Sequence, residues 1–213
     1  MRIIGCCGAA RAGKSTSSDI LCTRSGFKHY SFANSLKEYC ASIADFPRSE
    51  LGWDFSAEAW TGPKTDRGRR FLQDTSNAKR AYNENFFIEE LFKVIKQDTD
   101  SGEVEVALID DFRYINELYT LSHAKQPLIY ISNPKAEADW LAAFTLGEPW
   151  ATHVSETQWR LWLHVNPLYC YEIHNTSGKD LLKLQLDRFL DYSEHCNTAP
   201  DLYINNRLEL EIL

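Results

Sequence analysis

Residues 8 to 15, GAARAGKS, form a complete G-x-x-x-x-G-K-S/T motif. The motif follows a short apolar run from Arg2 to Cys7, and the stretch after it, 15–23, has the pattern of a helix. Gly8 and Gly13 allow the backbone to turn tightly and to direct its N–H groups at an anion, and the start of the helix adds a positive dipole. The chain is therefore expected to contain a strand, loop and helix unit that cradles a polyphosphate.

Two side chains of this loop have defined roles in such a unit. Lys14 is placed to reach the β- and γ-phosphates, and the Ser15 hydroxyl can coordinate Mg²⁺, with Thr16 as a second hydroxyl beside it. We therefore predict that a nucleotide and Mg²⁺ are the bound groups. The predicted nucleotide-binding residues are Gly8, Ala10, Arg11, Ala12, Gly13, Lys14, Ser15 and Thr16.

The rest of the chain alternates between strand and helix patterns. This alternation predicts an α/β fold of three layers, with a central, mostly parallel sheet and helices on both faces. Strands are predicted at 2–7, 29–32, 103–109, 127–132 and 169–174, and helical segments at 15–23, 33–43, 69–97 and 180–190. Core-facing stripes are predicted for Leu36, Tyr39, Cys40 and Ile43, and for Phe87, Leu91, Val94 and Ile95. We expect one domain over 1–213, with a loop-rich insertion near 45–68 and a lid-like segment near 133–165.

The charge balance limits the partners of the chain. The 213 residues include 23 Lys and Arg against 30 Asp and Glu, a formal net charge of -7. Nucleic acid is therefore disfavoured as a partner unless a local basic cluster binds it. No apolar run approaches the roughly 18 residues of a membrane helix, and none of the six cysteines forms a C-x-x-C pair. We expect free thiols and a cytoplasmic protein, and we leave open whether it forms a homodimer.

Acidic and basic side chains outside the loop complete a candidate site. Asp110 and Asp111 follow the predicted strand 103–109, where a phosphate-binding loop needs a carboxylate for the water shell of its metal, and either residue could serve. Arg113 lies two residues further and could place a cation beside a transferring phosphoryl group. A basic cluster at the start of a helix could bind a phosphorylated substrate. It comprises Arg67, Arg69, Arg70, Lys79 and Arg80. His153 is expected to be a hydrogen-bonded structural residue.

Several segments in order along the chain resemble the bacteriophage deoxynucleoside monophosphate kinases, within the wider group of P-loop nucleoside monophosphate kinases. The resemblance rests on GAARAGKST at 8–16, FANSLKE at 32–38, GRRFLQ at 68–73, IDDFRYINE at 109–117, THVSE at 152–156 and EIHNTSGKDLLKL at 172–184. The chain departs from the family where Asn133 stands in place of a frequent arginine, with Lys135 nearby. The resemblance implies phage origin and the host cytoplasm as the location.

The resemblance also implies roles for individual residues. Asp111 and Arg113 would be the family's D-x-R pair, with Lys14 as the third catalytic residue and with Ser15 and Asp111 holding Mg²⁺ directly or through water. The residues that would face the acceptor are Lys37, Arg70, Gln73 and Arg80, and we add Arg69 from the basic cluster. The implied reaction is transfer of the γ-phosphoryl group of ATP to a deoxynucleoside monophosphate.

Two other functions stay open at this point. A related kinase could phosphorylate a hydroxyl of a nucleoside or of a hydroxymethylated pyrimidine in DNA, and Asp110 or Asp111 would then be its base. A protein of another class, a nucleotide-binding switch without catalysis, would bind nucleotide and transfer nothing.

Overall fold

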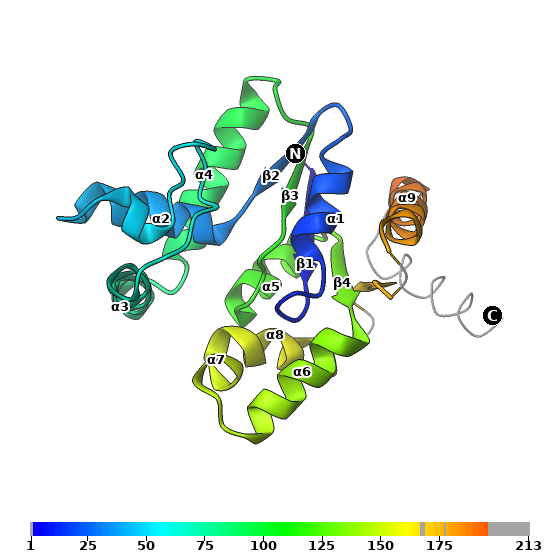
Figure 1. Cartoon of the computed structure of the whole chain (residues 1–213). Helices are drawn as coiled ribbons and strands as arrows, with labels where there is room; N and C mark the ends of the chain where they lie inside the picture. The colour runs from blue at the N-terminus through cyan, green and yellow to red at the C-terminus, as the bar shows by residue number, and fades with distance from the viewer. Residues whose placement is uncertain (1, 167–168, 177, 196–213) are drawn as a thin grey trace. The chain divides into compact units, whose positions relative to one another are not determined.

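The computed structural model of the chain describes residues 2–166, 169–176 and 178–195. These residues form two compact units (Figure 1). Unit 1 contains the described residues up to His29 and from Asp98 onward, and unit 2 contains Tyr30 to Gln97. Cys196 and the segment 202–213, for which the sequence predicts no element, lie outside the described residues.

Unit 1 is built on a five-stranded parallel sheet with the strand order β2-β3-β1-β4-β5. The strands are β1 (Arg2–Cys7), β2 (Phe27–Tyr30), β3 (Val106–Ile109), β4 (Leu128–Ser132) and β5 (Tyr171–His174). The helices are α1 (Lys14–Leu21), α5 (Ile115–His123), α6 (Pro134–Thr145), α7 (Pro149–Thr152), α8 (Val154–Val165) and α9 (Lys179–His195). The predicted α/β fold with a parallel sheet is confirmed.

Helices cover both faces of this sheet. Successive side chains of β1 point to opposite faces, so neighbouring residues of β1 contact different helices. Cys6 lies against Ser18 of α1 on one face. Gly5 faces α5 on the other, and a Cβ at Gly5 would stand 2.5 Å from Leu121 Cδ2. The first face also carries α9, which packs against α1, and the second carries α8, which packs against α5. Both faces of the central strands are thus buried, which is why these strands are almost continuously apolar.

The parallel arrangement brings the carboxyl ends of the strands to one edge of the sheet. The loop from Gly8 to Gly13 follows β1, Asp110 follows β3, Asn133 follows β4 and Asn175 follows β5. In open parallel sheets, ligands bind outside this edge. The fold therefore gathers the predicted loop and the predicted carboxylates from distant parts of the sequence.

Unit 2 is helical. It consists of α2 (Phe32–Ile43), the short 3₁₀ helix η1 (Arg48–Leu51), α3 (Asp66–Tyr82) and most of α4 (Phe86–Asp100). A small core of Cys40, Leu51 and Leu72 joins α2, η1 and α3. The loop-rich stretch that the sequence places near 45–68 belongs to this unit, where it contains η1 and a bridge between Asp54 and Ala59.

Three details of unit 2 differ from the sequence prediction. The helical stretch 69–97 is two helices, because Asn83 ends α3 and its side chain accepts a hydrogen bond from the Asn85 backbone. Val94 is 45% exposed although Phe87, Leu91 and Ile95 are buried as predicted. Ile88 is also buried, which rotates the apolar stripe away from Val94. The predicted burial of Ile43 is wrong as well, since this residue is 52% exposed at the last turn of α2.

Gly68 permits a backbone contact that we expect any larger residue to break. A Cβ at Gly68, in α3, would stand 1.9 Å from the carbonyl oxygen of Glu50 in η1. We expect Gly68→Ala to destabilise the protein by about 2 kcal/mol, although alanine favours a helix, because η1 must move. Thermal unfolding followed by circular dichroism measures this. Asn77→Ala on the exposed side of α3 is the control and should be neutral or stabilising; equal melting temperatures for the two variants would contradict the close contact.

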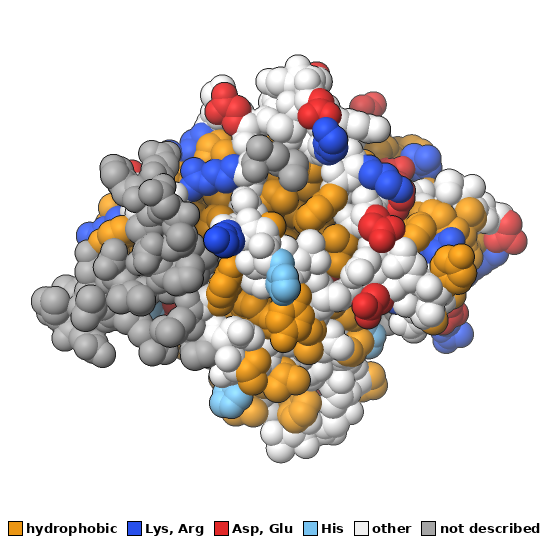
Figure 2. Space-filling view, turned by 180° about the vertical axis from the view of Figure 1, so that it is seen from behind, with side chains coloured by type: hydrophobic (Ala, Val, Ile, Leu, Met, Phe, Trp, Pro, Cys, Tyr) orange, Lys and Arg blue, Asp and Glu red, His pale blue; other side chains and the backbone are white. Residues whose placement is uncertain are grey.

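The surface carries both apolar and charged side chains. Figure 2 shows them intermixed on the face opposite to that of Figure 1. The exposed apolar residues of α6 to α8 and the turn between α6 and α7 include Leu141, Leu146, Trp150, Leu161 and Val165. Within the described part of the chain, no helix is long and apolar enough to cross a membrane. Cys6, Cys7, Cys22, Cys40 and Cys170 are free thiols, as expected.

Candidate active site

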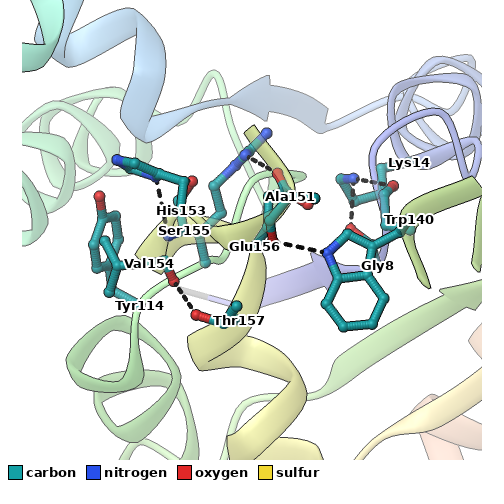
Figure 3. A network of polar contacts seen from close by, with 12 residues as sticks. Gly8, Lys14, Tyr114, Trp140, Ala151, His153, Val154, Ser155, Glu156 and Thr157 are labelled. Atoms are coloured by element: carbon teal, nitrogen blue, oxygen red, sulfur yellow. Dashed lines mark hydrogen bonds and ion pairs between the residues drawn. The ribbon is translucent and has the colours of Figure 1, made fainter. Parts of the chain in front are cut away.

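The loop between β1 and α1 has the geometry expected of a phosphate cradle. Gly13 caps α1 in the left-handed conformation, with φ 106°, and no side chain caps the helix. Gly13 has no side chain that could cap the first N–H groups of α1, which lie at the position where an anion is bound in such loops. Lys14 folds back along the loop, and its Nζ donates to the carbonyl oxygens of Gly8 and Ala9, both at 2.8 Å (Figure 3).

The two glycines of the motif are required by close contacts as well as by backbone angles. Gly8 has a φ of 145°, and a Cβ there would stand 2.5 Å from the carbonyl oxygen of Ile131 in β4. A Cβ at Gly13 would stand 2.3 Å from Nδ2 of Asn175. That amide nitrogen donates to the Ala12 carbonyl at 2.8 Å. The loop is therefore braced between β4 and the turn that follows β5.

The remaining predicted nucleotide-binding residues lie in the same loop and the first turn of α1. Ala12 is buried and Ala10 is half-buried. Arg11 is exposed and holds a positive φ of 66° at the tip of the loop. Ser15 and Thr16 follow Lys14 in the first turn of α1, and Ser15 is exposed while Thr16 is half-buried. The structure brings all eight of these residues into one continuous segment.

Asp110 is the carboxylate that contacts Ser15. The Ser15 Oγ donates its proton to Asp110 Oδ2 at 2.8 Å. Because a hydroxyl has a single proton, Ser15 has no second proton to donate while this bond is present. The other oxygen, Oδ1, lies 2.8 Å from Nε2 of His29 in β2. The sequence left Asp110 and Asp111 open and the resemblance pointed to Asp111. Asp111 lies next in the chain and is half-buried.

The environment of Asp110 keeps it ionised. Burial alone would raise the pKa of this carboxyl group, but the hydrogen bonds from His29 and Ser15 and the charge of Lys14 hold its pKa below the ordinary value. The hydrogen bond to Asp110 raises the pKa of His29. A negative carboxylate thus stands beside the Ser15 hydroxyl at neutral pH.

The donor set of Ser15 and Asp110 fits Mg²⁺. Both contribute oxygen atoms, which this hard cation prefers. Among the described residues there is no group of three His, Cys, Asp or Glu side chains that could hold a metal by itself. Magnesium commonly binds through one or two protein oxygens, with substrate phosphates and waters as the other ligands. The residues present suit that mode.

Arg113 is fixed from two directions. Its backbone N–H donates to Oε2 of Glu117 at 2.9 Å, and its guanidinium Nη1 lies 2.6 Å from Oε1 of Glu156 in α8. The Glu156 side chain is only 9% exposed, and among the described residues its Oε2 has no hydrogen-bond partner. Burial and the like charge of Arg113 lower the pKa of Lys14, while the charge of Glu156 opposes this. Arg113, Glu156 and Lys14 therefore act on one another electrostatically.

The segment 133–165, for which the sequence predicts a lid, consists of α6, α7 and α8. Asn133 caps α6, since its Oδ1 accepts from the Ala136 N–H at 3.0 Å. The arginine of this segment is Arg160 in α8, whose guanidinium lies 3.6 Å from the ring centre of Trp140 and pairs with Glu137. His153 caps α8 through a bond from the Ser155 N–H, which confirms its expected structural role (Figure 3).

The predicted acceptor residues lie in unit 2, on α2 and α3. Arg69, Arg70 and Gln73 are exposed on α3, on the side away from the buried Gly68 and Leu72. Lys37 of α2 is 9% exposed, with its Nζ 3.3 Å from Asn34 Oδ1.

The basic cluster predicted around α3 is only partly directed at solvent. The Arg80 guanidinium lies 5.3 Å from the ring centre of Phe87. Lys79 lies over the ring of Tyr39, and Arg67 pairs with Asp45. Arg67, Arg69 and Arg70 are exposed, whereas Lys79 and Arg80 are half-buried.

Sequence reasoning missed His29, Glu156 and Asn175 as site residues. His29 and Glu156 carry no motif that assigns them to the loop, and their contacts exist only after folding. Asn175 had a signal, because NTSG at 175–178 is a turn sequence directly after a predicted strand. A turn at the carboxyl end of a parallel strand is expected beside the ligand site.

Comparison with known proteins supports the fold. Neither a protein-family model nor a curated protein matches the sequence. Among solved structures, TT1252 from Thermus thermophilus aligns over 92% of this chain and 98% of its own, with 13% identity and a TM-score of 0.51. A dephospho-CoA kinase from Campylobacter jejuni aligns over 90% of this chain and 96% of its own, with 18% identity and a TM-score of 0.46. At such identities the likeness to TT1252 shows a shared α/β fold and nothing about the reaction.

Proposed function

We propose that this protein transfers the γ-phosphoryl group of ATP to the phosphate of a deoxynucleoside monophosphate. The observation that carries the proposal is the constellation at the end of β1 and β3. Lys14 lies on the loop carbonyls, Ser15 is bonded to Asp110, and Arg113 acts electrostatically on Lys14. A phosphate-binding loop, an oxygen donor set for Mg²⁺ and a further cation are the parts that phosphoryl transfer requires.

In this mechanism the chain positions the reactants and stabilises charge. An oxygen of the acceptor phosphate forms a bond to the γ-phosphorus of ATP, the bond from that phosphorus to the bridging oxygen breaks, and ADP leaves. Lys14 would exchange its contacts with the carbonyls of Gly8 and Ala9 for the β- and γ-phosphates. Ser15 and Asp110 would hold Mg²⁺, which neutralises developing charge on the phosphates when it is bound. Arg113 would supply positive charge beside the transferred group.

The state of Asp110 argues against its use as the base that a hydroxyl acceptor would need. A hydroxyl must lose a proton to a base, whereas a phosphate monoester has its second pKa near about 6 and is largely ionised at neutral pH. Both oxygens of Asp110 are engaged, by Ser15 and by His29, and its pKa is held low. Asp110 is therefore a poor candidate for that base.

The choice of a deoxynucleoside monophosphate rests on the resemblance of the sequence segments and on α3. Arg69 and Arg70 present two exposed guanidinium groups, and Gln73 lies one turn away on the same side of the helix. Each guanidinium group can bind a phosphate through two parallel hydrogen bonds, and a nearby amide can bond to a base edge. These residues are proposed to bind the acceptor.

Measurement of ADP release tests the proposal directly. ATP and Mg²⁺ are supplied with dAMP, dGMP, dCMP, dTMP, dUMP or the 5-hydroxymethylated forms of dCMP and dUMP, and in parallel with the matching nucleosides and with an oligonucleotide. We expect release with one or more monophosphates and none with the other acceptors. Release only with a nucleoside or oligonucleotide would move the acceptor to a hydroxyl. Nucleotide binding without ADP release for any acceptor would instead support the alternative function of a nucleotide-binding switch.

A further inference from the structure

We propose that His29 is a positioning residue for the magnesium site, acting through Asp110. The inference rests on the proposed nucleotide site and deepens it, because nothing in the loop motif assigns a role to β2. His29 is the third of the four residues of β2, and Asp110 directly follows β3, which is the neighbour of β2 in the sheet. The sheet order thus brings an imidazole from an edge strand to the carboxylate.

The two hydrogen bonds of Asp110 fix its orientation. A carboxyl group rotates about its terminal bond with little preference, so a single hydrogen bond leaves its plane free to turn. Here Nε2 of His29 lies 2.8 Å from Oδ1 and Oγ of Ser15 lies 2.8 Å from Oδ2. Partners on both oxygens determine which oxygen faces Ser15.

The orientation of Asp110 in turn determines the orientation of the Ser15 hydroxyl. A hydroxyl has one proton and two lone pairs, and the proton is donated to Asp110 Oδ2. The lone pairs are then available to a cation. Without the contact to His29, the carboxylate could turn and the hydroxyl proton would lose its fixed acceptor. Groups that orient metal ligands in this way commonly affect metal affinity by about tenfold or more.

A contribution to folding alone would have a different signature. The side chains of His29 and Asp110 are 36% and 8% exposed, so loss of the contact leaves a buried carboxylate with one partner fewer and should lower the melting temperature. A loss of stability alone would not make nucleotide affinity depend differently on Mg²⁺. Loss of the contact is therefore expected to change how nucleotide affinity depends on Mg²⁺ and to leave metal-free nucleotide affinity nearly unchanged.

The test compares ADP affinity by isothermal titration calorimetry over a series of Mg²⁺ concentrations, including none. We expect His29→Phe to raise the Mg²⁺ concentration for half of the effect by about tenfold. We expect metal-free ADP affinity to stay within about twofold, since no phosphate contact is removed. His29→Gln retains an N–H donor and should recover most of the loss. Lys28 precedes His29 in β2 and pairs with Asp98. Lys28→Gln is therefore the matched control and should leave the Mg²⁺ dependence of ADP affinity unchanged.

Two results would overturn the inference: an unchanged Mg²⁺ dependence in His29→Phe, or an equal loss of ADP affinity with and without Mg²⁺. Should His29→Phe fail to fold, His29→Asn replaces it, because its shorter side chain does not reach Asp110. ADP release is measured separately on the unaltered protein. Absence of transfer to every acceptor would overturn the proposed reaction, while a Mg²⁺ shift in the variant would still support the role of His29 in binding.

Discussion

We expect Lys14→Ala to lower the rate of ADP release by at least about 10³-fold, with the fold retained. Lys14 is the cation of the loop that can reach the β- and γ-phosphates, and no water can replace its charge in a partly buried position. Its two hydrogen bonds to the carbonyls of Gly8 and Ala9 are lost in the variant. Gly8 and Ala9 are buried, so their carbonyls lose a hydrogen-bond partner in the variant. The variant also no longer holds a charge in a mostly desolvated position, and because these two effects oppose each other the net loss of stability should be small. Steady-state ADP release and thermal unfolding measure the two effects.

Lys135→Ala is the matched control for Lys14→Ala. The Lys135 side chain is 85% exposed on α6, and it pairs with Asp139 of the same helix at 3.2 Å. Its removal takes the same charge from the protein and should leave the rate within about twofold, because exposed pairs contribute little. Activity of Lys14→Ala within tenfold of the unaltered protein would refute the assignment of the phosphate-binding loop.

The second large effect is expected at the pair of Arg113 and Glu156. We expect Arg113→Ala to lower ADP release by about 10³-fold, because it removes a cation proposed to lie beside the transferred group. The same change leaves the buried carboxylate of Glu156 without its partner, which should cost about 2 kcal/mol of stability. Activity and the free energy of unfolding are measured on the same preparations.

A double variant separates the two roles of Arg113. Glu156→Gln keeps the shape of the side chain and removes the charge that Arg113 neutralises. In the double variant Arg113→Ala with Glu156→Gln, we expect most of the lost stability to return and the activity to stay low. If stability does not return, the cost of Arg113→Ala has another origin. If Arg113→Ala retains activity within tenfold, Arg113 has no part in the transfer.

The phosphate-binding loop could be predicted from the sequence because its chemistry is local. The phosphate-binding loop consists of eight residues that include two glycines at fixed spacing, a lysine and a hydroxyl. The apolar run before it and the helix after it define its ends. The predicted strand 2–7 coincides with β1, and the helix predicted from Ser15 begins at Lys14. Strand and helix periodicity also predicted the α/β fold, since both faces of a parallel sheet must be buried.

The apolar stripes of unit 2 show where periodicity becomes imprecise. A stripe predicts which residues share a side of a helix, but its edges depend on what the helix packs against. Val94 and Ile43 lie at such edges and are exposed, while Phe87 and Cys40 are buried. The predicted basic cluster is likewise less exposed than its sequence suggests, because aromatic rings of α2 and α4 lie close to Lys79 and Arg80.

The sequence by itself determined the loop, the fold class and the positions of most strands. Only the tertiary structure decided which carboxylate contacts Ser15, that His29 holds that carboxylate, and that Glu156 pairs with Arg113. Glu156 lies 43 residues from Arg113, and Asn175 lies 163 residues from Ala12 of the loop. Contacts over such separations depend on strand order and on the angles at which helices leave the sheet. These are set by the packing of the whole core, which no local pattern of residues encodes.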